Sequence, residues 1–136
     1  MKAFPLKIVT PDGVKYDGQA EELVVRTVSG DMGIMAGHIS CVAPLGMGQA
    51  MVITGGERRY GACIGGMVSI VGENVTLLPT TFEWSEDIDT ERACASEKRA
   101  QSVLQDKTST ATDIKLAEAR LKRALIRKNV AQHKPK

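Results

Sequence analysis

The first 84 residues consist of short apolar, β-branched runs separated by turns that contain glycine or proline. Runs with the composition of strands occupy residues 4–9, 21–28, 49–54, 57–60, 66–71 and 75–79. Thr10-Pro11-Asp12-Gly13 and Gly55-Gly56 predict tight turns, because proline presets one backbone angle and glycine accepts positive ones. Strands so closely spaced predict an antiparallel sandwich or barrel, since parallel neighbours would need crossover helices between them.

Towards the C-terminus the apolar residues recur at helical spacings of three, four and seven. Asp87 is the predicted N-cap of a helix that ends near Gln105. Thr110-x-x-Asp113 is a capping box that predicts a second helix to about Val130. Because the link between them is short, the two helices are expected to form a hairpin. The side chains predicted to face each other are Ala93, Ala100 and Val103 from the first helix and Ile114, Ala117, Leu121 and Ala124 from the second.

Composition divides the chain near Trp84. All thirteen glycines and all five aromatic residues lie at or before this position, whereas the segment that follows is rich in Ala, Leu, Lys, Arg and Glu. Glycine suits tight turns, and continuous helix requires its absence. We therefore expect a β domain at residues 1–84 and a helical domain at residues 85–136. The sequence has no stretch near the ~20 apolar residues of a membrane span and no secretory signal, so we expect the protein inside the cell.

Charge follows the same division. Residues 1–84 carry six lysines and arginines against eight acidic residues, whereas residues 85–136 carry twelve against eight. The helical domain is therefore basic, which suits contact with nucleic acid, acidic lipid, a nucleotide or an acidic protein. The alternative is that these charges only solvate a helix face.

Residues that carry catalytic chemistry are sparse. Gly30–His38 is the segment richest in glycine and is expected to form a shaped loop, but it lacks the Gly-Lys-Ser/Thr end of a phosphate-binding loop. His38 has no second histidine, cysteine or carboxylate at ligand spacing, which favours a structural or interface role. Cys41, Cys63 and Cys94 fit neither a disulfide framework nor a zinc site and are expected to be buried thiols. We expect no enzyme active site.

Several side chains expected between the two helices are alanines. A buried alanine methyl contributes much less than the roughly 1.5–3 kcal/mol of a buried leucine or isoleucine. Helices of this length are also marginal on their own. We therefore expect a hairpin near the balance between a folded-back and an extended arrangement, which suits a conformational switch.

Four segments carry a resemblance to a known family. They are Val9-Thr10-Pro11-Asp12-Gly13, Gly30-Asp31-Met32-Gly33-Ile34-x-x-Gly37-His38, Ile88-Asp89-Thr90-Glu91-Arg92-Ala93 and Leu121-Lys122-Arg123-Ala124. Over essentially its full length the chain resembles the ε subunit of bacterial F-type ATP synthase. The third segment matches the Ile/Leu-Asp-x-x-Arg-Ala motif of that family, whereas Ala36 and Ser40 stand where many members have proline.

The resemblance implies an N-terminal antiparallel β-sandwich of about ten strands followed by a C-terminal antiparallel two-helix hairpin. It also implies a non-catalytic rotor subunit in the central stalk of a proton-translocating synthase. In this family the sandwich couples the γ subunit to the c-ring. Asp31 and Met32 correspond to the c-ring contact, and His38 corresponds to the γ contact. The implied location is peripheral, at the cytoplasmic face of the bacterial plasma membrane, with the membrane reached only through the complex and no nucleic-acid partner.

The resemblance also gives the hairpin a regulatory role. In the family the folded hairpin permits rotation, and the hairpin extended along γ inhibits ATP hydrolysis by the α/β catalytic subunits. The basic residues expected to contact an acidic segment of the β subunit are Lys122, Arg123, Arg127 and Lys128.

Some bacterial members bind ATP on the folded hairpin as a regulatory ligand, and no catalytic cofactor is implied. The matching positions are Glu83, Ile88, Asp89, Arg92, Ala93, Arg99, Arg123 and Arg127. Guanidinium groups from two helices suit phosphates, and the Asp89 carboxylate suits the amino group of adenine. The alternative is that these arginines solvate the helices or pair with Glu91, Glu97 and Glu118.

A β-sandwich adaptor with a basic helical tail is the alternative from another functional class, with nucleic acid or an acidic partner as its ligand. Against nucleic acid, the tail lacks aromatic residues for stacking on bases, and the β domain is mildly acidic.

Overall fold

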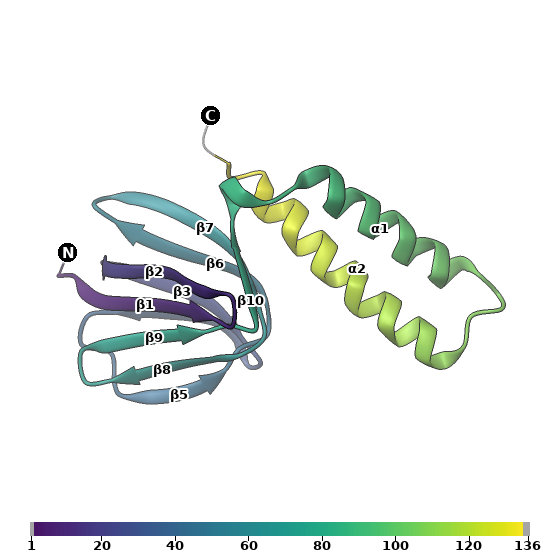
Figure 1. Ribbon diagram of the computed structural model, residues 1–136. Helices are drawn as coiled ribbons and strands as arrows, with labels where there is room; N and C mark the ends of the chain where they lie inside the picture. The colour runs from purple at the N-terminus through teal and green to yellow at the C-terminus, as the bar shows by residue number, and fades with distance from the viewer. Residues whose placement is uncertain (1, 135–136) are drawn as a thin grey trace. The chain divides into compact units, whose positions relative to one another are not determined.

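The computed structural model describes residues 2–134, and the chain divides into two compact units between Trp84 and Ser85 (Figure 1). The strands of the first unit are β1 (Phe4–Thr10), β2 (Gly13–Ala20), β3 (Glu22–Thr27), β4 (Gly30–Met35), β5 (Cys41–Pro44), β6 (Met47–Thr54), β7 (Glu57–Ile64), β8 (Met67–Val71), β9 (Asn74–Leu78) and β10 (Thr81–Trp84). The second unit comprises the 3-10 helix η1 (Ser85–Asp87) and the helices α1 (Thr90–Gln105) and α2 (Ala111–Ala131).

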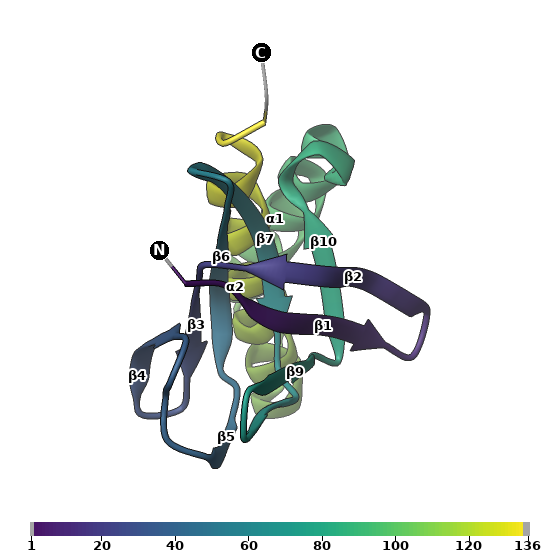
Figure 2. The same ribbon diagram turned by 90° about the vertical axis from the view of Figure 1, so that its left-hand side faces the viewer.

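The strands form two five-stranded sheets that pack as a β-sandwich. One sheet has the order β2-β1-β9-β8-β5 and the other has the order β10-β7-β6-β3-β4. Figure 2 shows the β1–β2 hairpin running across β6 and β7, so the strands of the two sheets cross. The predicted β-sandwich followed by a two-helix hairpin is confirmed.

The predicted tight turns join neighbouring strands. They are Pro11-Asp12 between β1 and β2 and Gly55-Gly56 between β6 and β7, and a further turn, Gly72-Glu73, joins β8 and β9. Gly55 and Gly56 have φ angles of 58° and 78°. Two consecutive positive φ angles are the conformation of a primed hairpin turn, which only glycine adopts readily.

One strand pair departs from the antiparallel expectation. β1 and β9 are parallel, with Leu6 opposite Val75 and Ile8 opposite Leu77. The expectation that parallel neighbours need a crossover helix was wrong here, because the strands that lie between β1 and β9 in sequence supply the long connection.

The segment expected to be a shaped loop is largely a strand. Gly30–Met35 forms β4 at the edge of its sheet and pairs with β3 along its whole length. The segment forms a strand despite its glycines, because Ile34 is fully buried in the core. The glycine signal is correct at the two ends, where Gly30 and Gly37 take φ angles of 121° and 86° in turns.

The sandwich core draws apolar side chains from both sheets. The largest fully buried ones include Leu6, Ile8, Leu23, Ile34, Val68 and Leu77. Each contributes roughly 1.5–3 kcal/mol relative to an exposed side chain. The first unit therefore has a core of the kind that stabilises an independent domain.

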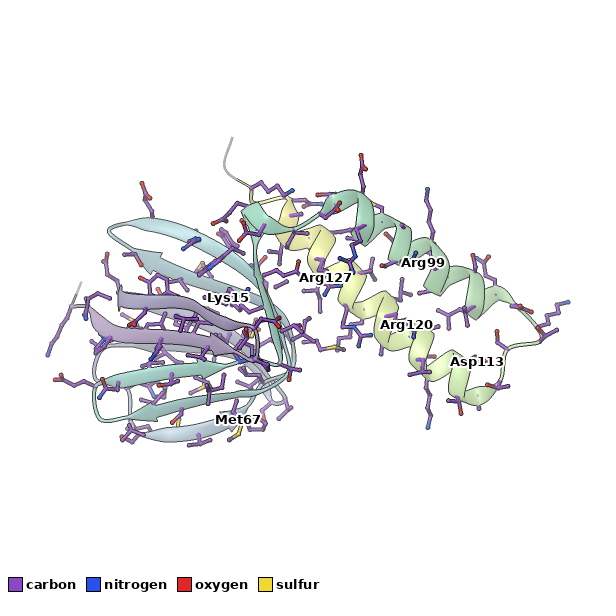
Figure 3. The ribbon with its side chains drawn as sticks, in the orientation of Figure 1. Lys15, Met67, Arg99, Asp113, Arg120 and Arg127 are labelled. Carbon is purple, nitrogen blue, oxygen red and sulfur yellow. The ribbon has the colours of Figure 1, made fainter. Side chains whose placement is uncertain are left out.

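Trp84 ends the last strand and is held from three sides. Its indole Nε1 donates a hydrogen bond of 2.9 Å to the carbonyl oxygen of Lys15, which Figure 3 labels. The Phe82 ring meets the indole edge-to-face at 4.9 Å between centroids, and the Arg59 guanidinium lies 3.8 Å from the ring. These contacts fix the last residue of the sandwich.

Helix α1 begins later than the sequence predicts. Asp87, the expected N-cap, ends η1, and Asp89 is the N-cap instead. Its Oδ1 accepts a hydrogen bond of 3.1 Å from the Arg92 amide. Aspartate is a preferred N-cap residue, so the sequence alone does not distinguish Asp87 from Asp89. Ile88, which lies between them, is 2% exposed, and the burial of this side chain favours Asp89 as the N-cap.

The capping box that opens α2 is confirmed. Thr110 Oγ1 accepts a hydrogen bond from the Asp113 amide, and Asp113 Oδ2 accepts one from the Thr110 amide, each at 3.1 Å. Two of the unpaired amides at the start of α2 are thereby satisfied.

Alanines occupy the interface between α1 and α2. Ala93, Ala100, Ala117 and Ala124 are buried, as predicted, and Val130 and Ala131 at the end of α2 are buried as well. Val103 and Leu121 are only half-buried, and Ile114 is 36% exposed, so its predicted place in the interface was wrong. The buried stripe of α2 repeats every seventh residue from Ala117 to Ala131, which leaves Ile114 to one side of it.

The three cysteines differ in burial. Cys63 is buried, whereas Cys41 and Cys94 are half-buried, so the expectation of three buried thiols was correct for Cys63 alone. Burial raises the pKa of the Cys63 thiol to about 12, from an ordinary value of 9.0. The folded state therefore favours the neutral thiol.

Replacement of Gly66 by alanine should destabilise the sandwich strongly. Gly66 has a φ of 97°, and an added Cβ would overlap the Leu78 carbonyl oxygen. The backbone conformation alone costs about 1–3 kcal/mol in a non-glycine residue. Gly72→Ala is the matched control, because Gly72 also has positive φ but faces open space. Denaturant unfolding should show a larger loss for Gly66→Ala, and equal losses would contradict the packing at Gly66.

The stability of the sandwich should fall at alkaline pH partly through Cys63. Between pH 9 and about 12 the Cys63 thiol ionises in the unfolded chain but stays neutral in the folded one, because its pKa is raised by burial. Its contribution to the free energy of unfolding is therefore fully present below pH 9 and is lost as the pH rises towards 12. The slope per group reaches at most about 1.4 kcal/mol per pH unit. The unfolding free energy of Cys63→Ala should decline less steeply above pH 9 than that of the parent, and equal slopes in the two proteins would contradict the role of Cys63.

Candidate functional site

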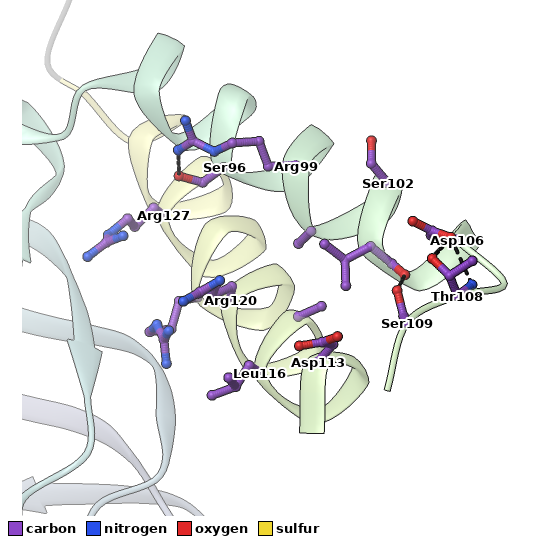
Figure 4. Close-up of a pocket in the computed structure, with 14 residues that line it drawn as sticks. Ser96, Arg99, Ser102, Asp106, Thr108, Ser109, Asp113, Leu116, Arg120 and Arg127 are labelled. Atoms are coloured by element: carbon purple, nitrogen blue, oxygen red, sulfur yellow. Dashed lines mark hydrogen bonds between the residues drawn. The ribbon is translucent and has the colours of Figure 1, made fainter. Parts of the chain in front are cut away.

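A groove of about 820 Å³ lies along the helical hairpin (Figure 4). Its lining residues come from α1, the link between the helices, and α2. They are Ser96, Arg99, Ala100, Ser102, Val103, Asp106, Thr108, Ser109, Asp113, Leu116, Ala117, Arg120, Arg123 and Arg127. The volume is in the range of about 300–1,000 Å³ that small-molecule sites occupy.

Four arginines make part of this groove strongly cationic. Arg99 comes from α1, whereas Arg120, Arg123 and Arg127 follow one another at spacings of three and four on α2. Residues so spaced share one face of a helix, and the fold of the hairpin brings Arg99 to the same groove. Figure 3 shows Arg99, Arg120 and Arg127 along the hairpin. Arg99 Nη2 donates a hydrogen bond of 3.2 Å to Ser96 Oγ.

The other end of the groove is built around the link between the helices. In Figure 4, Arg99 and Arg127 lie towards one end, and Asp106 and Asp113 lie towards the other. Asp106 Oδ1 accepts hydrogen bonds from the Thr108 hydroxyl at 2.7 Å and the Thr108 amide at 2.9 Å. These two bonds, the hydroxyl bond first, lower the pKa of Asp106.

The two carboxylates therefore have structural roles. Asp106 shapes the link, and Asp113 completes the capping box of α2. Ser109 Oγ further ties the link to α1 through a hydrogen bond of 2.7 Å to the Val103 carbonyl oxygen. An anionic ligand would consequently meet its counter-charges at the arginine end of the groove.

The structure brings together three of the eight residues predicted for ATP binding. Arg99, Arg123 and Arg127 line the groove. Glu83 lies on β10 in the sandwich, opposite Ala62. The role of Glu83 in a nucleotide site stays a prediction.

The four predicted residues at the start of α1 lie outside the lining of the groove. Ile88 and Ala93 are buried, with exposed fractions of 2% and 3%. Asp89 is the N-cap, and its carboxylate binds the amide of Arg92, whose side chain is exposed. The motif that these residues form thus has a clear part in shaping the hairpin, while its part in binding a ligand stays a prediction.

Sequence reasoning missed Arg120 and the hydroxyl groups of Ser96, Ser102 and Ser109. The signal for Arg120 was present, because it precedes Arg123 by three residues on the same helix face. The serines gave no comparable signal, since their place in the groove depends on how the two helices pack.

The four basic residues expected to meet an acidic partner do not share one environment. Arg123 and Arg127 are half-buried in the groove, whereas Lys122 is exposed and does not line it. Lys128 forms an ion pair with Glu97 of α1, with 2.6 Å between Nζ and Oε2. The hydrogen bond to Glu97 is the main cause of the raised pKa of Lys128.

The predicted c-ring contact lies on strand β4. Asp31 is opposite Arg26 of β3, and its Oδ1 is 2.9 Å from the Arg26 Nε. The stem of Arg26 lies against β6 at Gly48, where an added Cβ would come within 2.7 Å of the Arg26 Cβ. Met32, the next predicted residue, is half-buried against the core. Asp31 is therefore an exposed carboxylate held in place by a neighbouring strand.

His38, the predicted γ contact, follows β4 in a tight turn. Its amide donates to the Met35 carbonyl oxygen at 3.2 Å, and its Nδ1 lies 2.8 Å from the Ile39 carbonyl oxygen. With Met35, Gly72 and other residues it lines a cavity of about 110 Å³. A cavity of this size is suited to a single side chain rather than to a ligand of the usual pocket volume.

An uncharged face extends over β5, β8 and β9. Its outward residues are Val42, Pro44, Met67, Ser69, Val71, Asn74, Thr76 and Leu78. Met67, which Figure 3 labels, is 46% exposed and lies opposite Leu78, which is 45% exposed. Val42 and Val71 are exposed by 57% and 65%. A surface without charges, on which exposed apolar side chains outnumber the polar ones, is typical of the centre of a protein interface.

Within residues 2–134, histidine, cysteine and acidic side chains form no group of three that would hold a metal ion. The helices of this same part of the chain are too short or too polar to cross a membrane.

Comparison with family models covers both units. Residues 3–85 match the model described as "ATP synthase, Delta/Epsilon chain, beta-sandwich domain". Residues 86–132 match the one described as "ATP synthase, Delta/Epsilon chain, long alpha-helix domain".

Similar sequences carry one common name. The chain is 43% identical over 134 residues to the ATP synthase epsilon chain of Bacillus cytotoxicus, which covers 98% of this chain and 100% of that one. It is 44% identical over 131 residues to the ATP synthase epsilon chain of Bacillus velezensis, covering 96% of this chain and 98% of the other.

Solved structures show the same fold at low identity. A chain in the Euglena gracilis mitochondrial ATP synthase, in a structure of OSCP, F1 and the c-ring, matches with a TM-score of 0.82 at 22% identity, covering 96% of this chain and 82% of that one. A chain in the central stalk and c-ring of the Tetrahymena thermophila enzyme matches with a TM-score of 0.59 at 11% identity, covering 93% and 95%.

Proposed function

The chain belongs to the family of ATP synthase epsilon chains, and from this we propose that it couples the rotor of the synthase and regulates ATP hydrolysis through its hairpin. It is a stalk subunit rather than the catalytic chain of that complex. The family match favours this function over the nucleic-acid adaptor.

The sandwich is the part that we assign to coupling. The uncharged face of β5, β8 and β9, together with the cavity beside His38, has the chemistry of a protein interface, and we assign it to the γ subunit. Asp31 and Met32 are assigned to the polar side of the c-ring. The exposed Asp31 carboxylate supports this assignment, because Arg26 fixes its position.

The observation that carries the regulatory proposal is the convergence of Arg99, Arg123 and Arg127 on one groove. The family resemblance implies ATP binding for these three arginines, and the folded hairpin brings Arg99 of α1 to the two arginines of α2. Guanidinium groups form charge-assisted, often bidentate hydrogen bonds with phosphates. We assign the triphosphate of ATP to this end of the groove.

ATP bound in this groove would stabilise the folded hairpin. A ligand shifts a conformational equilibrium only by its differential affinity, and a site made from both helices exists only when they are folded together. At 100 times its Kd a ligand adds about 2.7 kcal/mol to the state that it binds. Because the helix interface consists largely of alanines, an increment of this size is large enough to decide the equilibrium.

When ATP is scarce, the hairpin would open and its basic residues would meet an acidic segment of the β subunit. Hydrolysis would then be inhibited when the nucleotide pool is low. The net positive charge of the helical unit supports contact with an acidic partner. We place the chain at the cytoplasmic face of the bacterial plasma membrane, bound only through the complex.

The isolated chain should bind ATP, and the Arg123→Ala variant should bind ATP more weakly. The loss of a charged hydrogen-bond donor costs about 1.5–3 kcal/mol, which is roughly 10- to 150-fold in Kd. Calorimetric titration with ATP measures this. Lys115→Ala is the control, because Lys115 is an exposed cation of α2 that does not line the groove. Equal affinity in Arg123→Ala and Lys115→Ala would contradict the site.

Arg92→Ala distinguishes the groove from the motif at the start of α1. The structure places the exposed Arg92 outside the groove, whereas the family motif includes it. Weakened ATP binding in this variant would extend the site to the start of α1. Unchanged binding would restrict the site to the groove.

Truncation after Glu86 should relieve the inhibition of ATP hydrolysis in a reconstituted complex. The truncated chain keeps the whole sandwich with its own core, so it should still copurify with the complex. The hydrolysis rate should rise relative to the complex with the full chain. A rate that is unchanged, with the truncated chain present in the complex, would refute the regulatory role.

A further inference from the structure

An ion pair connects Glu97, in the middle of α1, with Lys128, in the last turn of α2. Lys128 Nζ lies 2.6 Å from Glu97 Oε2, and the two side chains are 35% and 17% exposed. Glu97 is thus largely withdrawn from solvent. A pair in this environment is screened less by salt than a fully exposed one.

The surroundings make this pair important for the folded hairpin. The interface that it crosses is formed by small side chains, such as Ala93, Ala100 and Ala124, which bury little area. A second cation, Lys134, which follows α2, donates a hydrogen bond of 2.6 Å to the carbonyl oxygen of Ile88, just before α1. The ion pair and this hydrogen bond therefore stabilise a helix interface whose apolar contacts contribute little.

Lys128 is also one of the four basic residues assigned above to an acidic partner. In the folded hairpin its ammonium group is already engaged by Glu97. Because Glu97 Oε2 lies 2.6 Å from the Lys128 ammonium, a carboxylate of another protein that binds this ammonium in the same way has to displace Glu97. Glu97 and a carboxylate of the partner thus compete for the Lys128 ammonium group.

We propose that Lys128 exchanges one carboxylate for another: it binds Glu97 in the folded hairpin and a carboxylate of an acidic protein segment in the open one. Glu97 thereby competes with the partner for the same cation. This inference deepens the proposed regulation and rests on it, because it names the residue that sets the balance between the two states.

Hydrogen exchange on the isolated full-length chain tests the pair without any partner. Glu97→Gln and Lys128→Gln should each accelerate amide exchange in α1 and α2 several-fold. The double variant should exchange no faster than either single one, because both single changes remove the same interaction. Lys115→Gln is the control on the exposed surface of α2 and should match the parent.

Hydrolysis by the reconstituted complex then separates competition from simple destabilisation. Glu97→Gln opens the hairpin and leaves Lys128 free for the partner, so hydrolysis should fall below that of the parent. Lys128→Gln opens the hairpin but removes the contact with the partner, so hydrolysis should lie well above that of Glu97→Gln. If the pair only stabilised the fold, both variants would change hydrolysis in the same direction and to the same extent.

Two results would overturn the proposal. Exchange rates equal to the parent in Glu97→Gln and Lys128→Gln would show that the pair does not hold the hairpin. Equal hydrolysis rates in these two variants would show that Lys128 has no second carboxylate. Should truncation after Glu86 also leave hydrolysis unchanged, the proposed regulation itself has failed, and the exchange data still report on the ion pair independently.

Discussion

The packing of alanine against alanine between α1 and α2 is the constraint on which the behaviour of the hairpin depends. Ala93, Ala100, Ala117 and Ala124 let the helices approach closely but bury little apolar surface. At about 25 cal/mol per Å², such an interface leaves the folded hairpin with a small margin. Interactions of a few kcal/mol, which would be minor in a large core, therefore decide whether the two helices stay together.

The rest of the structure divides into parts that depend on this margin and parts that do not. The sandwich has its own core of leucine, isoleucine and valine side chains, and it presents the uncharged face and Asp31 on a rigid framework. The hairpin instead has Arg99, Arg123 and Arg127 in a groove, where an anion adds stability, and Lys128 paired with Glu97. One unit is thus suited to permanent assembly and the other to a reversible change.

Much of this arrangement follows from the sequence, and the failures have physical causes. Glycine turns, the helix pattern and the capping box at Thr110 are local signals, and they were correct. The parallel pairing of β1 with β9 and the strand β4 were missed, because both depend on contacts between distant segments. The choice of Asp89 over Asp87 as N-cap depends on the burial of Ile88. Arg120 was missed although its spacing to Arg123 was visible.

The proposal that the folded hairpin is a nucleotide sensor depends on phosphates reaching the arginines of the groove. Nuclear magnetic resonance of the arginine Nε–Hε groups during titration of the full chain with ATP tests this most directly. The Nε–Hε signals of Arg99, Arg123 and Arg127 should shift in a saturable manner, while those of Arg26 and Arg58 in the sandwich should stay unchanged. Signals that do not move at saturating ATP, or that move equally in both units, would contradict the nucleotide site.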